Sequence, residues 1–94
     1  MTFTERIKQL REQRQLPQRK VAEALDIDSA TYCKIERGER KAKREQLPII
    51  AEFLSADKDE LLSLWLADQV AAVVAAEKDI ADKVLDIAKE NIRK

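Results

Sequence analysis

Apolar residues early in the chain recur at the three- and four-residue spacing that places them on one face of a helix. The pattern predicts a short helix from about Gln18 to Leu25, with Val21, Ala22 and Leu25 on its buried face. Asp26 interrupts the pattern and is one of the few residue types that tolerate a left-handed turn. We therefore expect this helix to end in a tight turn at Asp26.

A second short helix is expected directly after this turn. Asp28 lies where an N-cap belongs, because its carboxylate can accept the free N–H groups of the next turn. The helix should continue to about Arg37 with Tyr32 and Ile35 pointing inward, and Gly38 suits a left-handed C-cap. Two short helices joined by so small a turn predict a helix-turn-helix, whose second helix can enter the major groove of DNA.

The apolar pattern predicts four further helices around this pair. They are expected at Thr4–Gln13, Arg44–Leu54, Asp57–Ala76 and Asp79–Ile92. Thr4 and Asp57 suit N-caps, and Pro48 lies close enough to the start of its helix to be tolerated. The expected fold class is therefore all-α.

The long helix that follows Asp57 carries two apolar stripes. Leu61, Leu64 and Trp65 form one stripe, which we expect to close the core with Trp65 as a large core residue. The other stripe consists of Leu62, Leu66, Val70, Val73 and Val74. A helix with two apolar faces must bury both. The second stripe therefore requires the last helix, a second chain, or both; we favour dimerisation through residues 60–92 over a six-helix domain closed within one chain.

Composition narrows the possible classes of protein. The 94 residues include no histidine and one cysteine, which removes the usual zinc ligands and the common general base. We therefore expect no catalysis, no metal and no cofactor. The single cysteine suits a reducing cytoplasm. The longest apolar candidate is interrupted by Asp68, Glu77 and Asp79, so no membrane span is expected.

Net charge is zero over the whole chain but is unevenly distributed. Residues 1–56 carry a net charge of +3 and residues 57–94 carry −3. The segment 34–44 holds six basic residues against Glu36 and Glu39. This asymmetry predicts a basic binding domain at 1–56 and a helical dimerisation extension at 57–94.

These residues resemble the XRE type of helix-turn-helix regulator, which is similar to Cro and the phage repressors. The resemblance covers about residues 4–62 and rests on Gln18, Ala22, Leu25, Ile27, Thr31, Lys34, Ile35, Glu36, Arg37 and Gly38. Pro17, Asp26 and Ala42 depart from the usual residues of the family, and the tail from Trp65 lies outside the shared region. The resemblance implies a lambda-repressor-like domain of about four to five helices.

The resemblance also implies roles for individual residues. It assigns Ser29, Ala30 and Lys34 to base edges in the major groove, in agreement with their predicted outward positions early in the second helix. Arg11 and Glu36 are expected to form the family's internal ion pair. The expected phosphate contacts come from Gln18, Arg37, Arg40, Lys41 and Lys43.

The expected function is that of a homodimeric transcriptional regulator of double-stranded DNA with a palindromic operator. A protein-interaction module without DNA binding is the main alternative, and a small nuclease is a weaker one. The role within DNA binding stays open between a phage-type repressor, an antitoxin component and the controller of a restriction–modification system. Cys33 is expected to be a small packed residue rather than a redox switch.

Overall fold

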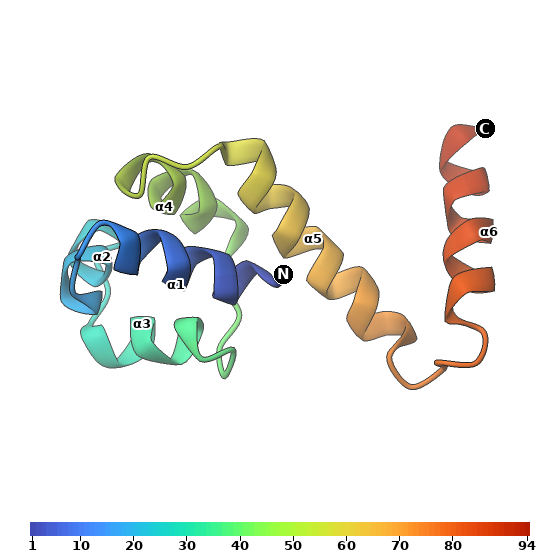
Figure 1. The fold of residues 1–94 in the computed structure, drawn as a ribbon, viewed down its shortest axis with the longest axis horizontal. Coiled ribbons are helices and arrows are strands. Elements are labelled where there is room, and N and C mark those ends of the chain that lie inside the picture. The colour runs from blue at the N-terminus through green and yellow to red at the C-terminus, as the bar shows by residue number, and fades with distance from the viewer.

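The computed structural model describes residues 1–94 and is entirely helical. The elements are α1 (Phe3–Gln13), α2 (Gln18–Ala24), α3 (Ser29–Glu36), a 3₁₀ turn η1 (Arg44–Gln46), α4 (Leu47–Phe53), α5 (Lys58–Val74) and α6 (Ala81–Arg93). Figure 1 shows α1–α4 and the start of α5 as one body, from which α5 leads away to an isolated α6. The Cα radius of gyration is 15.2 Å, whereas a compact domain of this length would have about 12 Å. The molecule is therefore elongated.

No helix is long and apolar enough to span a membrane.

Most helix ends lie close to the predicted ones, but Arg44–Gln46, expected within the fourth helix, forms a 3₁₀ turn, and α6 begins at Ala81 rather than at Asp79. Asp28 and Asp57 cap α3 and α5 as predicted, and Pro48 lies in the first turn of α4. The prediction that Thr4 caps α1 is wrong, because the helix begins at Phe3 and Thr2 is the N-cap. The Thr2 hydroxyl accepts a hydrogen bond from the N–H of Glu5 at 3.2 Å and donates to its carboxylate at 3.0 Å. Glu5, three residues after Thr2, stabilises the earlier cap.

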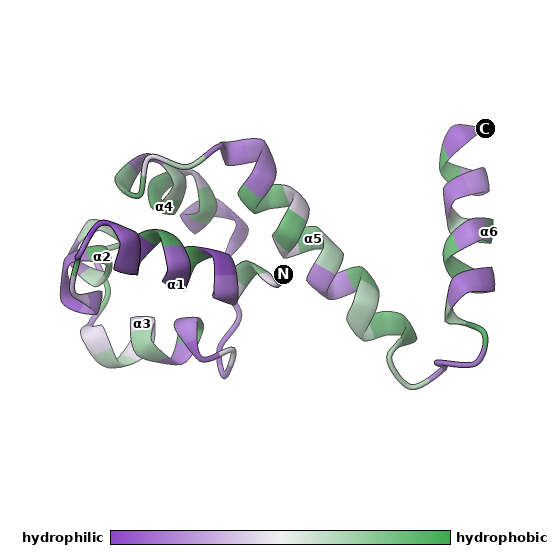
Figure 2. Cartoon of the chain, in the orientation of Figure 1, coloured by the Kyte–Doolittle hydropathy of each residue, from purple (hydrophilic) through white to green (hydrophobic).

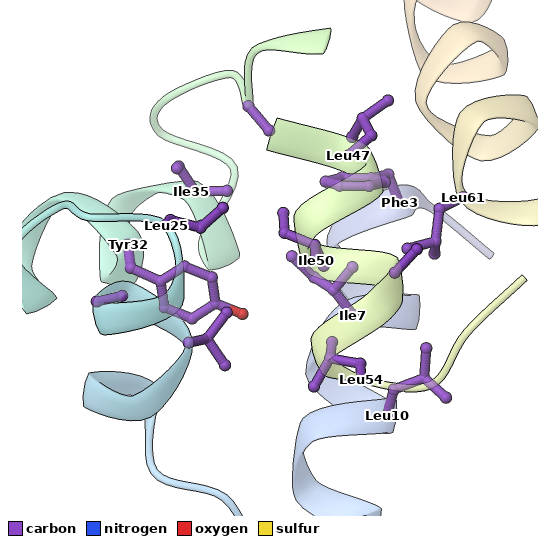
Figure 3. Close-up of a cluster of buried hydrophobic side chains, with 14 residues drawn as sticks. Phe3, Ile7, Leu10, Leu25, Tyr32, Ile35, Leu47, Ile50, Leu54 and Leu61 are labelled. Carbon is purple, nitrogen blue, oxygen red and sulfur yellow. The ribbon is translucent and has the colours of Figure 1, made fainter. Parts of the chain in front are cut away.

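The core lies between α1, α2, α3, α4 and the first turns of α5 (Figure 3). Tyr32 and Ile35 of α3 face Ile7 of α1 and Ile50 of α4, and all four side chains are at most 1 % exposed. Burying each large apolar side chain stabilises the fold by about 1.5–3 kcal/mol. The core therefore fixes α3 with its inner face fully covered.

The first stripe of α5 joins this core. Leu61 is fully buried, and Leu64 and Trp65 pack against the cluster while remaining half-buried. The core thus extends past residue 56, where the charge pattern predicts a domain division. Trp65 lies at the edge of the core because its indole reaches the loop before α4.

α6 stands apart from the body. None of its residues is buried, and none belongs to the core cluster. The alternative of a six-helix domain closed within one chain is therefore wrong. Figure 2 shows hydrophobic residues continuing along α5 beyond the body, and alternating hydrophobic and polar positions along α6. Most of the exposed large apolar side chains therefore lie beyond the body, although the body also exposes Met1, Ile49 and Phe53.

Three helices end in a left-handed residue that is not glycine. Gln15, Asp26 and Ser55 follow α1, α2 and α4 with φ of 54°, 57° and 53°. Asp26 thus adopts the turn conformation expected from the sequence. Such a conformation costs a residue other than glycine about 1–2 kcal/mol, and less for aspartate.

Candidate nucleic-acid interface

The turn between α2 and α3 is held by short-range hydrogen bonds. The N–H of Ile27 donates to the carbonyl of Ala22 at 3.0 Å and closes the end of α2. The N–H of Thr31 donates to the Asp28 carboxylate at 2.7 Å and caps α3. Hydrogen bonds from Thr31, with smaller contributions from the cations Lys34 and Arg40, lower the pKa of Asp28. The cap is therefore ionised at neutral pH, and the start of α3 is well defined.

α3 presents one face to the core and the other to solvent. Tyr32 and Ile35 are buried, whereas Ser29, Ala30 and Lys34 are exposed. Figure 1 shows α3 along the lower edge of the body with no helix beyond it. The three residues assigned to base edges thus share an open surface, early in a helix whose position the core fixes.

An internal ion pair joins α1 to the end of α3, as the family resemblance implies. Arg11 donates from Nε and Nη2 to the two carboxylate oxygens of Glu36, each at 2.8 Å. Its Nη1 also donates to the carbonyl of Leu16 at 2.8 Å. The side chains of Arg11 and Glu36 are only 13 % and 2 % exposed. A two-point pair of this kind fixes direction as well as distance, so it orients α3 on α1.

The electrostatics of this pair favour its charged form. Burial alone would raise the pKa of Glu36, but the hydrogen bonds from Arg11 and Gln18 and the positive charge of Arg11 lower this pKa. The same hydrogen bond raises the pKa of Arg11. The side-chain amide of Gln18 adds a weaker hydrogen bond to Glu36 at 3.3 Å. Residues from α1, α2 and α3 thus meet at one buried carboxylate.

Tyr32 lies beside this pair. Its side chain is fully buried and its hydroxyl makes no hydrogen bond. Burial, reinforced by the Glu36 carboxylate, raises the pKa of Tyr32 far above its ordinary value. The phenol therefore stays neutral and serves as a core ring.

A basic loop follows α3. Gly38 ends the helix with φ of 79°, and the N–H groups of Glu39 and Arg40 donate to the carbonyl of Lys34 at 2.9 and 3.2 Å. These bonds satisfy the free carbonyl at the end of α3. Ala42 is then buried. The loop is thus fixed at one end by the turn at Gly38 and at the other by the buried Ala42, and its charged side chains are exposed.

α5 contacts this loop through Trp65 and Gln69. The indole N–H of Trp65 donates to the carbonyl of Ala42 at 2.9 Å. The Lys41 ammonium lies 4.9 Å from the centroid of the Trp65 ring and donates to the side-chain oxygen of Gln69 at 2.6 Å. One turn of α5 therefore contacts both the backbone and a cation of the loop.

The same part of α5 also caps α1. The Asp68 carboxylate accepts a hydrogen bond from the N–H of Phe3 at 3.0 Å. A carboxylate at this position also opposes the positive end of the α1 dipole. Trp65, Asp68 and Gln69 thus tie α5 to two parts of the body. Sequence reasoning missed this role because the contacts span 23 to 65 residues and leave no local pattern.

The predicted phosphate-contact residues differ in their surroundings. Arg40 and Lys43 are exposed and form no salt bridge. Arg37 pairs with Glu39 at 2.9 Å on the surface, and Lys41 is held on α5. Arg40 and Lys43 are therefore the cations most available to an anionic partner.

The predicted dimerisation residues also fall into two groups. Leu66, Val70 and Val73 are 41 %, 49 % and 80 % exposed. Leu62 is instead half-buried against the core, and Val74 is buried within its own chain. Leu66, Val70 and Val73 therefore form the exposed apolar stripe of α5, and this name is kept below.

Comparisons with known proteins agree with this architecture. The family model described as a helix-turn-helix domain matches residues 2–64. The chain is similar to the HTH-type transcriptional activator BcrR of Enterococcus faecalis, with 38 % identity over 63 residues. This match covers 67 % of the chain but only 31 % of that relative, so the chain spans about a third of its length. No solved structure matches the chain. This chain therefore belongs to the helix-turn-helix domain family.

Proposed function

We propose that this protein regulates transcription by binding a palindromic operator in double-stranded DNA as a homodimer. The observation that carries the proposal is the open face of α3, which is fixed by a buried ion pair and followed by a basic loop. A helix docked in the major groove must be both accessible and rigidly placed. These two properties favour DNA binding over an interaction module.

Base recognition is proposed to come from Ser29, Ala30 and Lys34. The ammonium of Lys34 can donate to O6 or N7 of guanine, and the Ser29 hydroxyl can donate to or accept from several bases. Ala30 can contact the methyl group of thymine. All three side chains are exposed, and they occupy the first two turns of α3.

Phosphate contacts are proposed to surround this reading surface. Gln18 opens α2, where its backbone N–H can bind a phosphate while its side-chain amide is bound to Glu36. Arg37, Arg40, Lys41 and Lys43 extend the contact along the loop. Contacts of this kind carry much of the affinity but little sequence information, so specificity should depend on α3 and affinity on both.

Dimerisation is proposed to occur through the exposed apolar stripe of α5. Helix-turn-helix dimers place two reading helices one DNA turn apart, about 34–36 Å. Because α5 also anchors the basic loop, a dimer formed through α5 would fix both halves of the interface. In this proposal the division into a binding domain at 1–56 and a dimerisation extension at 57–94 is functional, and α5 connects the two parts.

The proposed activity requires neither catalysis nor a cofactor, and DNA binding would place the protein with DNA in the cytoplasm. Selection of bound duplexes from a random pool tests the proposal most broadly. Two inverted half-sites about one helical turn apart are expected. Recovery of a single asymmetric site would overturn the palindrome, and failure to enrich any sequence would favour the interaction-module alternative.

A further inference from the structure

α6 is an amphipathic helix without a partner in its own chain. Figure 1 shows it standing clear of the body, and none of its residues is buried. Ile80, which precedes the helix, and Ile87 are 50 % and 49 % exposed. A helix with one apolar face is stable in water only when that face is covered.

The apolar positions of α6 include a coiled-coil seam. Ile80, Val84, Ile87 and Asn91 are spaced by four, three and four residues, which is the heptad spacing of inward positions. A neighbouring row of the same spacing contains Ala81, Leu85, Ala88 and Ile92. Each row has half-buried members: Val84 in the first row, and Ala81 and Leu85 in the second. The first row has the larger side chains at its centre, because Val84 and Ile87 stand where the second row has Leu85 and Ala88. We therefore take the row through Ile80 and Ile87 as the seam.

Charges beside the seam select the orientation of a second α6. In an antiparallel pair related by a two-fold axis, Val84 of each copy faces Ile87 of the other. The flanking positions then place Lys83 opposite Glu90 of the second copy, and symmetry repeats this contact. In a parallel pair Lys83 would instead lie near Ala88, without a countercharge. The sequence of α6 is thus complementary to itself only when reversed.

We propose that two copies of this protein associate through an antiparallel pair of α6 helices, with Lys83 bound to Glu90 of the second copy on each side. A helix of 13 residues is too short to pair alone, so this contact acts together with the exposed apolar stripe of α5. The inference deepens the dimerisation part of the proposed function and rests on it. It adds the partner helix, its direction and the ion pairs.

Charge reversal in the full chain tests the pairing. Lys83→Glu and Glu90→Lys each turn two attractions into two repulsions, so each should raise the dimer dissociation constant about tenfold at low salt. An equimolar mixture of the two variants should form heterodimers with close to wild-type affinity, because every pair is again of opposite charge. Sedimentation equilibrium measures all three samples, and circular dichroism confirms that each variant is helical.

A matched control separates this seam from its neighbour. Asp82→Lys and Lys89→Glu make the same kinds of charge change on the opposite flank of α6, and they should leave the dissociation constant within about twofold. A stronger response there than at Lys83 and Glu90, or no heterodimer preference, would overturn the α6 pairing while leaving dimerisation through α5 intact. A wild-type chain that stays monomeric would overturn both.

Discussion

The far half of this protein is richer in apolar residues than the body, and it places them differently. In the body, side chains such as Ile7 and Ile50 are completely covered by neighbouring helices. Beyond residue 65, Leu66, Val73 and Ile92 expose 41 %, 80 % and 81 % of their surface. A single chain therefore completes the core of the body, whereas the far half leaves apolar surface of the kind that often marks an interaction site.

The two regions differ in the same way in their charged groups. In the body, Arg11 and Glu36 form a buried two-point pair that orients α3. On α6 the charges have no partner within the chain, because none of the salt bridges involves that helix. The internal pair stabilises the fold of one copy, whereas the charges of α6 bind a second copy in the proposed pairing.

The largest effect on the body should come from breaking the buried ion pair. Arg11→Ala leaves the Glu36 carboxylate buried without its partner, which should cost about 3–5 kcal/mol of unfolding free energy. Arg6→Ala is the control, because it breaks a more exposed pair with Glu60 and should cost less than about 1 kcal/mol. Urea denaturation measures both. Similar losses for the two variants would contradict the role assigned to Arg11.

The same pair predicts a pH dependence of stability with opposite signs in the two proteins. In the wild type the folded pKa of Glu36 is lowered, so its contribution is present above its unfolded pKa and is lost as pH falls through the folded pKa. In Arg11→Ala, burial is expected to raise this pKa. The variant should therefore gain stability relative to the wild type as pH is lowered from 7 to about 5. A parallel pH profile would count against the assignment.

The next effect should appear in the far half. Val73→Lys places a charge on the exposed apolar stripe of α5 and should raise the dimer dissociation constant at least about a hundredfold, or roughly 3 kcal/mol. The folded body should be unaffected, because Val73 is 80 % exposed in one copy. Ala71→Lys, on another side of the same helix, is the matched control. Light scattering measures the fraction of dimer in both variants. An equal loss of dimer in the two would exclude the exposed apolar stripe of α5 from the interface.

On the proposed DNA-binding surface, loss of a base contact and loss of a phosphate contact should change sequence specificity differently. Lys34→Ala should weaken binding to the preferred duplex by about 1–3 kcal/mol and relax specificity at one position. Arg40→Ala should weaken binding to all duplexes alike and reduce the salt slope by about 1. Fluorescence anisotropy on preferred and scrambled duplexes measures both variants. Equal losses on the two duplexes for Lys34→Ala would exclude it from base recognition.

The smallest effect should come from the contact between the two regions. Trp65→Phe keeps an aromatic ring near Lys41 but removes the indole N–H that binds the carbonyl of Ala42. Loss of one such hydrogen bond costs about 1 kcal/mol, so duplex affinity should fall about fivefold without a change in sequence preference. Unchanged affinity would mean that α5 does not position the loop.

What the sequence could predict depends on how local each interaction is. Asp28 caps α3 as expected, because a cap involves residues three apart. The sequence alone does not distinguish Thr2 from Thr4 as the cap of α1, because both lie near Glu5 and only the observed helix start separates them. The pair of Arg11 and Glu36 was accessible only through the family resemblance, because no local rule links residues 25 apart.

The contact of Trp65 with Ala42 does not follow from the family resemblance, because the tail from Trp65 lies outside the shared region. Heptad spacing marks α6 as amphipathic, but periodicity alone does not show whether its partner is its own body or another chain. The isolated position of α6 in the structure answers this question by removing the body as a partner.

Salt-dependent duplex binding tests the central claim, that the open face of α3 and its basic loop form a DNA-binding surface. Anisotropy titrations between about 50 and 200 mM salt should show affinity falling by at least about tenfold for a scrambled duplex, as expected when several phosphate contacts displace counterions. The preferred duplex should bind at least about a thousandfold more tightly than the scrambled one. Absence of duplex binding at 50 mM salt would contradict the claim.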